Sequence, residues 1–164
     1  MALIASLLMV YSGIIPEKKK ILFVEIIEIG LFALSDYILG GIYGTIVNLI
    51  SIIINYLCYK DKLNLNARII ITIVTVLIIL NNLSPLGIVL CFTMLIYLWR
   101  MNVKNIKYFK FLMIFYMTVW MIYDYSIKLY SSVLFDFLTI IMNIISIIKL
   151  NKKTEIKLQV KHVG

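Results

Sequence analysis

The sequence has little charge, two cysteines and one histidine, and each scarcity excludes a class of protein. Only 15% of its 164 residues are charged, while 63% are hydrophobic and the mean hydropathy is +1.03. A soluble fold of this size keeps a large surface that polar side chains must cover, so the composition excludes a water-soluble domain. Lipid accepts apolar side chains on the outside of a protein, and the sequence therefore indicates an integral membrane protein.

Metal centres and catalytic sites lack the residues that they need. Cys58 and Cys91 are isolated, without the partner spacing of a metal site, and His162 is the only histidine. No nucleophile, base and orienting group can be assembled, because the membrane Ser and Thr hydroxyls can bond back to their own helices. We expect neither an enzyme nor a cofactor, although paired carboxylates leave general acid–base chemistry open.

Alternating polarity is also missing, and this excludes a transmembrane β-barrel. Residues 69–80 and 138–148 are apolar at odd and even positions alike. Helices remain as the way to satisfy a backbone buried in lipid. The breaks in the apolar pattern predict seven spans, with six as the alternative, at about residues 2–15, 21–38, 40–58, 68–81, 85–99, 108–125 and 130–148.

Lysine and arginine residues fall in alternate breaks between these spans. Cytoplasmic loops collect such residues, and an outer N-terminus places every basic residue except Lys128 on the inner side. Removing one span would reverse each later loop, so the pattern predicts seven spans with an inner C-terminus. The first span has three lysines after it and none before it, the reverse of a secretory signal, and we expect it to be retained.

The net charge of +8 belongs to helix ends and not to a separate soluble patch. We therefore expect the lipid bilayer and its anionic headgroups as partners, and no nucleic acid. The tail over residues 151–164 alternates lysine with apolar residues, which fits a short surface segment or a frayed end.

An internal repeat appears when the chain is compared with itself at an offset of 88 positions, which is 124 minus 36. Asp36 then aligns with Asp124, and Asn55 with Asn143. The first three spans match the last three in the same orientation, as in transporters with parallel repeats. We expect an all-α polytopic membrane protein with a three-helix repeat over 1–60, a linker helix over 61–84, a second three-helix repeat over 85–150 and a cytoplasmic basic tail over 151–164.

Polar residues form two stripes at repeat-related positions, Asn48, Ser51 and Asn55 on the third span and Asp136, Thr139 and Asn143 on the seventh. Their spacing puts each set on one helix face. Polar groups are costly in lipid and should turn inward, where the two stripes would face each other and line a path for a small polar solute. The alternative is that they only bind helices together.

Four further carboxylates are candidates for a proton or cation site: Glu25, Glu28, Asp36 and Asp124. Glu25 and Glu28 lie one turn apart near the inner end of the second span. Pairing with Lys18 to Lys20, Lys107 or Lys110 is the alternative for them. Asp36 and Asp124 lie near the outer ends of their spans, and the alternative for them is a solvated helix cap.

The segment Trp120-Met121-Ile122-Tyr123-Asp124, followed by a helix with Asp136 and Asn143, resembles the bacterial inner-membrane YgjV family. The resemblance covers nearly the whole chain and implies a membrane location. The same plan is similar to the SWEET sugar transporters and, more loosely, to the PnuC vitamin-precursor transporters. The SWEET pattern implies that Asn48, Asp136 and Trp120 line a pocket. The chain departs from it in lacking a Pro-Gln pair and most helix prolines, which puts a proline-hinged rocking mechanism in doubt.

Two function classes follow from these observations. The first is a transporter or facilitator for a small polar solute, with its path between the two three-helix halves. The second is a membrane accessory or assembly protein, in which the polar stripes are packing contacts. An aqueous cavity that reaches Asn48 and Asp136 would favour the first, and a continuous dry interface the second.

Overall fold

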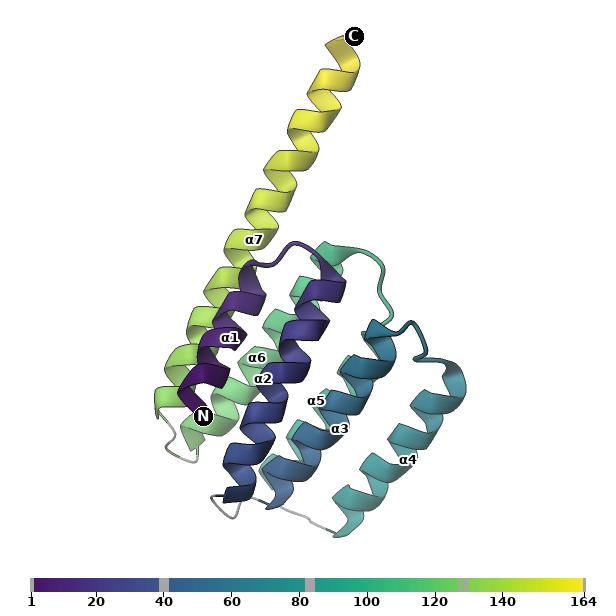
Figure 1. Cartoon of the computed structure of the whole chain (residues 1–164), viewed down its shortest axis with the longest axis vertical. Helices are drawn as coiled ribbons and strands as arrows, with labels where there is room; N and C mark the ends of the chain where they lie inside the picture. The colour runs from purple at the N-terminus through teal and green to yellow at the C-terminus, as the bar shows by residue number, and fades with distance from the viewer. Residues whose placement is uncertain (1, 39–41, 82–84, 127, 129, 164) are drawn as a thin grey trace.

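The computed structural model of the chain describes residues 2–38, 42–81, 85–126, 128 and 130–163, and over these residues it holds seven α-helices (Figure 1). They are α1 (Ala2–Ile14), α2 (Lys18–Ile38), α3 (Ile42–Tyr59), α4 (Leu65–Asn81), α5 (Pro85–Arg100), α6 (Ile106–Ser126) and α7 (Tyr130–Val163). Each predicted span corresponds to one helix, although α7 continues beyond the predicted end, so the all-α class and the number of helices are confirmed.

Local sequence explains where several helices begin. The Asn64 side-chain oxygen accepts a hydrogen bond from the backbone N–H of Ala67 at 2.9 Å, which caps the first turn of α4. Asn105 caps α6 in the same way through the N–H of Lys107, also at 2.9 Å. Pro85 is the first residue of α5, a position at which its missing N–H costs nothing. Three of the predicted breaks therefore contain residues that favour the start of the next helix.

Six of the helices form a ring. Helix α2 packs on α1 and α3, α6 packs on α5 and α7, α1 contacts α7, and α3 meets α5. Helix α4 contacts α5 from outside the ring, where the indole N–H of Trp99 donates to the Thr72 hydroxyl at 3.2 Å. A sequence-distant pair, α1 and α7, thus closes the bundle (Figure 1).

One end of the bundle carries the α1–α2, α3–α4 and α5–α6 connections, and we call it the basic end (Figure 1). It holds Lys18, Lys19, Lys20, Lys60, Lys62, Arg100 and Lys104. Helix α7 continues past it as one helix to Val163, where a short surface segment or frayed end was expected. The side chains of residues 153–164 lie outside the described ones.

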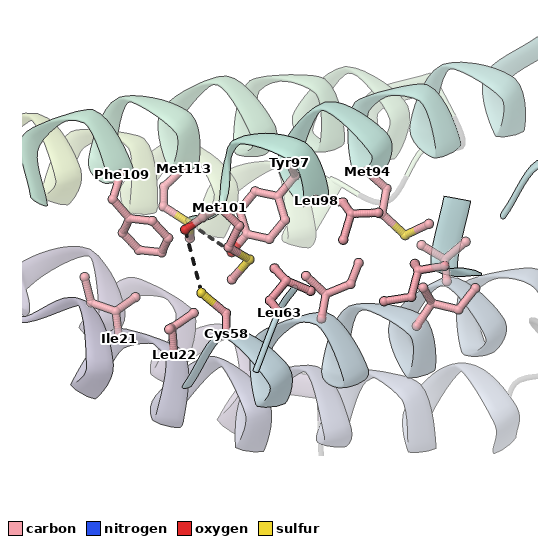
Figure 2. Packing of buried hydrophobic residues seen from close by; sticks show 14 of the residues in the cluster. Ile21, Leu22, Cys58, Leu63, Met94, Tyr97, Leu98, Met101, Phe109 and Met113 are labelled. Carbon is pink, nitrogen blue, oxygen red and sulfur yellow. Dashed lines mark hydrogen bonds between the residues drawn. The ribbon is translucent and has the colours of Figure 1, made fainter. Parts of the chain in front are cut away.

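The apolar core lies between α2 and α3 on one side and α5 and α6 on the other (Figure 2). Several methionine and cysteine side chains belong to this core. The Cys58 thiol contacts the Met101 carbonyl oxygen at 3.7 Å, and the Tyr97 hydroxyl contacts the Met113 sulfur at the same distance. Cys58 and Cys91 are both free and buried. They serve as small apolar side chains.

The outside of the bundle is apolar. Large side chains such as Leu3, Ile70 and Phe92 are each about 60% exposed, which a lipid environment accepts and water does not. By length and composition alone, two stretches in the described chain are able to cross a membrane, Ile106–Ser126 and Tyr130–Lys152. Most of the other helices are apolar but shorter, and α2 is long enough but carries several charged residues.

Candidate functional site

A buried glutamate joins three helices inside the ring. The Asn55 amide of α3 donates to Glu25 Oε2 of α2 at 3.0 Å, and the Tyr97 hydroxyl of α5 reaches the same oxygen at 3.3 Å. That hydroxyl is also 3.4 Å from the Asn55 carbonyl oxygen. We call these three residues the Glu25 cluster; each is at least 96% buried.

A buried lysine joins the other three helices of the ring. The Lys110 ammonium of α6 donates to the Gly13 carbonyl oxygen of α1 at 2.7 Å and to Asn143 Oδ1 of α7 at 3.4 Å. The Asn143 amide donates in turn to the Thr139 carbonyl oxygen at 3.0 Å. Lys110 has no exposed surface, and its charge is held in part by the negative end of the α1 dipole.

Helix α1 can deliver its carbonyl because Gly13 brings it close to α7. A Cβ atom at Gly13 would lie 2.9 Å from Met142 Cβ and 3.2 Å from the Thr139 carbonyl oxygen. Side-chain atoms essentially never approach so closely, so only glycine permits this contact.

Gly13→Ala is expected to destabilise the protein by about 1 to 3 kcal/mol, because the added methyl group must push α1 away from α7. The matched control is Gly30→Ala in α2, where a Cβ meets nothing within 4 Å. Alanine is the better helix former by about 1 kcal/mol, so the control should be neutral or stabilising. Thermal unfolding of both variants in detergent measures the difference, and equal stability would contradict the close approach.

Lysines at the basic end bind groups other than the two glutamates. The Lys18 ammonium donates to the Met101 carbonyl oxygen and, at 3.0 Å, to that of Val103, just beyond α5. Lys19 forms an ion pair with Asp61 at 2.6 Å, and this exposed pair lowers the pKa of the Asp61 carboxyl. The structure therefore gives Glu25 and Glu28 no ion pair among the described residues.

Three interior carboxylates each have an oxygen without a hydrogen-bond partner among the described residues: Glu25 Oε1, Glu28 Oε2 and Asp136 Oδ2. Glu28 and Asp136 are 3% and 4% exposed, so water does not solvate them from the surface. Glu28 lies in the electrostatic field of Glu25 on the same helix and of Asp136 on α7, and these like-charged carboxylates repel one another. Buried polar atoms are costly when unpaired, and such atoms therefore mark a place where a ligand, an ion or water can bind.

The remaining two candidate carboxylates lie toward the end opposite the basic end. The Asn48 amide donates to Asp36 Oδ2 at 2.9 Å, and Gly44 makes room for that carboxylate, since a Cβ there would lie 2.6 Å from the same oxygen. Asp124 is 8% exposed and interacts electrostatically with Asp36.

The polar stripes lie partly as the sequence suggests. Ser51 and Thr139 are buried, but their hydroxyls donate to carbonyl oxygens of their own helices, at 2.9 and 2.8 Å. The Asn48 and Asn55 amides donate to carboxylates of α2, and Asn143 accepts from Lys110 of α6, each within its own half. The Asn55 carbonyl oxygen also accepts from Tyr97 of the other half. No hydrogen bond joins one stripe to the other over the described residues.

Trp120 is partly buried against the core and stands edge-on between two tyrosines of α6. Its ring centroid lies 6.2 Å from that of Tyr116 and 5.7 Å from that of Tyr123. Tyr116 in turn stacks on Tyr97 at 4.9 Å. The predicted pocket residue is thus one part of an aromatic ladder.

Sequence reasoning missed Tyr97 and Gly13, and considered Lys110 only as one of several basic-end partners for the glutamates. The available signal for Lys110 was its place one turn inside an apolar span, where an unpaired ammonium is costly. Tyr97 and Gly13 carry no such mark, because tyrosine and glycine are common in apolar helices.

A cavity of about 720 Å³ lies at the basic end and is open to the outside. Its lining includes Tyr11, Phe23 and Tyr59 together with Lys19 and Lys20. None of the predicted pathway residues lines this cavity.

An apolar exterior around a ring of helices with a charged interior defines the chain as a helical membrane protein. The family model Imp-YgjV, described as a bacterial inner membrane protein, matches residues 1–154, and the chain belongs to that family. The resemblance to the YgjV family and the inner-membrane location are thereby confirmed. No curated protein and no solved structure matches the chain.

Proposed function

We propose that this protein is a transporter or facilitator for a small polar solute, not an enzyme, with its path through the helix ring between the two three-helix halves. One observation carries the proposal: Glu28 of α2 and Asp136 of α7 are buried, interact with each other and each keep an unpaired oxygen. A protein that only had to pack would gain stability from apolar side chains at these positions.

The proposal includes seven crossings, with the N-terminus outside and the C-terminus in the cytoplasm. The loops of the basic end and the extension of α7 lie at the same end of the bundle (Figure 1), which supports a common cytoplasmic side for their lysines. Helices shorter than about 20 residues fit a bilayer that is thinned around the protein.

Cysteine labelling tests this topology. In a variant without Cys58 and Cys91, a cysteine at Lys128 should react with an impermeant maleimide added to whole cells. Cysteines at Lys62 and Lys153 should react only after the cells are opened, and a reporter fused after Gly164 should be cytoplasmic. Labelling of the Lys153 position in whole cells would overturn the orientation.

We also propose that the ring consists of two parallel repeats, residues 1–60 and 85–150, with α4 as the linker over 61–84. The order of contacts supports this: α1–α2 corresponds to α5–α6, α2–α3 to α6–α7, and α1–α7 to α3–α5. Cross-half hydrogen bonds support it as well. Lys110 of the second half binds the Gly13 carbonyl and Lys18 of the first half binds that of Met101, and these two carbonyls lie 88 positions apart.

The second candidate is a membrane accessory or assembly protein, and the hydroxyl groups favour it. Ser51, Thr75 and Thr139 are buried and bond back to their own helices, as side chains do that only fill an interface. This candidate accounts for the hydroxyls but not for the unpaired carboxylate oxygens.

A metabolite uptake comparison tests the proposed function. Cells with and without the protein are given a labelled mixture of small polar metabolites, and intracellular amounts are compared over time. The proposal expects at least one solute to accumulate faster with the protein, and the same activity after reconstitution of the purified chain in liposomes. Equal uptake of every solute, with the protein present in the membrane, would favour the accessory candidate.

A further inference from the structure

Five carboxylates form a connected series along the interior, which we call the acidic series: Glu25, Glu28, Asp136, Asp124 and Asp36. Glu28 interacts electrostatically with Glu25 and Asp136, Asp136 with Asp124, and Asp124 with Asp36. On α2 alone, Glu25 and Asp36 are separated by about 16 Å of helix rise. The series therefore covers about half of the thickness of a bilayer core.

Four aromatic side chains form a second series beside the first, and we call them the aromatic series: Tyr97, Tyr116, Trp120 and Tyr123. Consecutive ring centroids lie 4.9, 6.2 and 5.7 Å apart. The aromatic series runs along the acidic one: Tyr97 contacts Glu25 at 3.3 Å, Tyr116 interacts electrostatically with Glu25 and Glu28, and Tyr123 with Asp124 and Asp36.

The interior holds more carboxyl groups than basic groups near the middle of these series. Lys110 lies in the electrostatic field of Glu25 and offsets that carboxylate. The electrostatic neighbours of Glu28 and Asp136 are other carboxylates, and no described cation is among them. Both side chains are more than nine-tenths buried and keep an unpaired oxygen, so these two carboxyl groups are free to bind a cationic ligand.

The shape of the site does not suit a metal ion. Metal ions need three or more ligands around one point, and no such group of acidic, cysteine or histidine side chains occurs over the described residues. Carboxyl groups in a series with aromatic rings beside them suit a larger cation, whose charge is attracted to carboxylates and to ring faces alike.

Resting on the proposed function, we infer that the solute is an organic cation, an amine or quaternary ammonium compound that binds between Glu28 and Asp136 on one side and Tyr116 and Trp120 on the other. Glu28 and Asp136 supply the charge that neutralises the ligand. The rings of Tyr116 and Trp120 replace the water around its alkyl groups. Glu25 stays committed to Asn55 and Tyr97 through hydrogen bonds and shapes the inner end of the site.

Binding to the purified full-length protein in detergent tests this inference. The probe is tritiated choline, with tetramethylammonium as a charged competitor and 3,3-dimethylbutan-1-ol as a neutral compound of the same shape as choline. We expect saturable choline binding that tetramethylammonium displaces and the neutral compound does not. Absence of saturable binding, or equal displacement by the neutral compound, would overturn the inference.

Substitutions in the acidic and aromatic series test whether these residues bind choline. Glu28→Gln, Asp136→Asn and Trp120→Leu should each weaken choline binding at least about tenfold, the size expected for one lost charge or ring contact in a desolvated site. The matched control Glu17→Gln removes an exposed carboxylate of the basic end and should bind as the wild type does. Elution as a single species on gel filtration establishes that a variant is folded. If a carboxylate variant does not fold, the test rests on two other results: choline binding by Trp120→Leu and the competition experiment on the wild type.

Failure of this inference is distinguishable from failure of the proposed function. If the uptake comparison finds a neutral or anionic solute and choline does not bind, the protein is a transporter and its cargo is not a cation. Displacement of choline by sodium as readily as by tetramethylammonium would assign the site to inorganic cations and overturn the inference. No uptake of any solute and no binding would reject both.

Discussion

Replacing Asp136 with asparagine is expected to reduce solute uptake at least about tenfold while the amount of protein in the membrane stays unchanged. Asparagine has the same size and retains hydrogen-bonding capacity, so packing in α7 is preserved. The substitution removes the ionisable group from a side chain that is 4% exposed and has an unpaired oxygen in the interior. Hydrogen bonds to charged groups contribute about 1.5 to 3 kcal/mol, which corresponds to a loss of roughly 10- to 150-fold.

Uptake and membrane abundance must be measured together for this variant. Asp61→Asn is the matched control, since it removes a carboxylate whose side chain is 73% exposed at the basic end. Asp136→Leu separates the two function classes: a pathway role predicts normal abundance without uptake, and a packing role predicts lower abundance. Unchanged uptake in both Asp136 variants would exclude this residue from the transport chemistry.

Replacing Lys110 with methionine is expected to lower stability and membrane abundance strongly. Methionine fills a similar volume, but the Gly13 carbonyl oxygen and Asn143 Oδ1 both lose their donor. Each buried acceptor left unpaired costs about 1 to 3 kcal/mol. The nearby Glu25 carboxylate also loses one of its two cationic neighbours, Lys110 and Lys18, which adds to the cost.

The matched control for Lys110→Met is Lys104→Met, because Lys104 is exposed at the same end of the bundle. Thermal unfolding in detergent and immunoblotting of membranes give the two readouts. The control should unfold at the wild-type temperature. If Lys110→Met does so as well, the lysine does not hold α1, α6 and α7 together, and its hydrogen bonds contribute nothing net.

The helices were predictable because the information for each one is local. A run of apolar residues in lipid has to form a helix, and polar caps such as Asn64 and Asn105 mark where a new helix begins after the chain turns. The seventh helix shows the limit of this reasoning. Its apolar part ends near residue 148, but helix formation continues to Val163, since nothing in the tail interrupts it.

The sequence predicted which residues belong to the candidate site, but not which of them contact one another. An ionisable or amide side chain in an apolar span must face the interior, and Glu25, Asn55, Asp136 and Asn143 are all buried. Their partners come from distant parts of the chain: Lys110 and Gly13 are 97 positions apart, and Glu25 and Tyr97 are 72 apart. The spacing of residues within one helix shows which of them share a face, but it does not show which residue of another helix they contact.

The sequence by itself determined the membrane class, the number of helices and which polar side chains turn inward, because those properties follow from the free energy of transferring single residues into lipid. Only the tertiary structure decided that Lys110 binds the end of α1, that Glu25 is shared by Asn55 and Tyr97, and that Glu28 and Asp136 keep unpaired oxygens. The rotation and depth of each helix set these contacts. Helix packing decides both, through close approaches such as Gly13 against Met142.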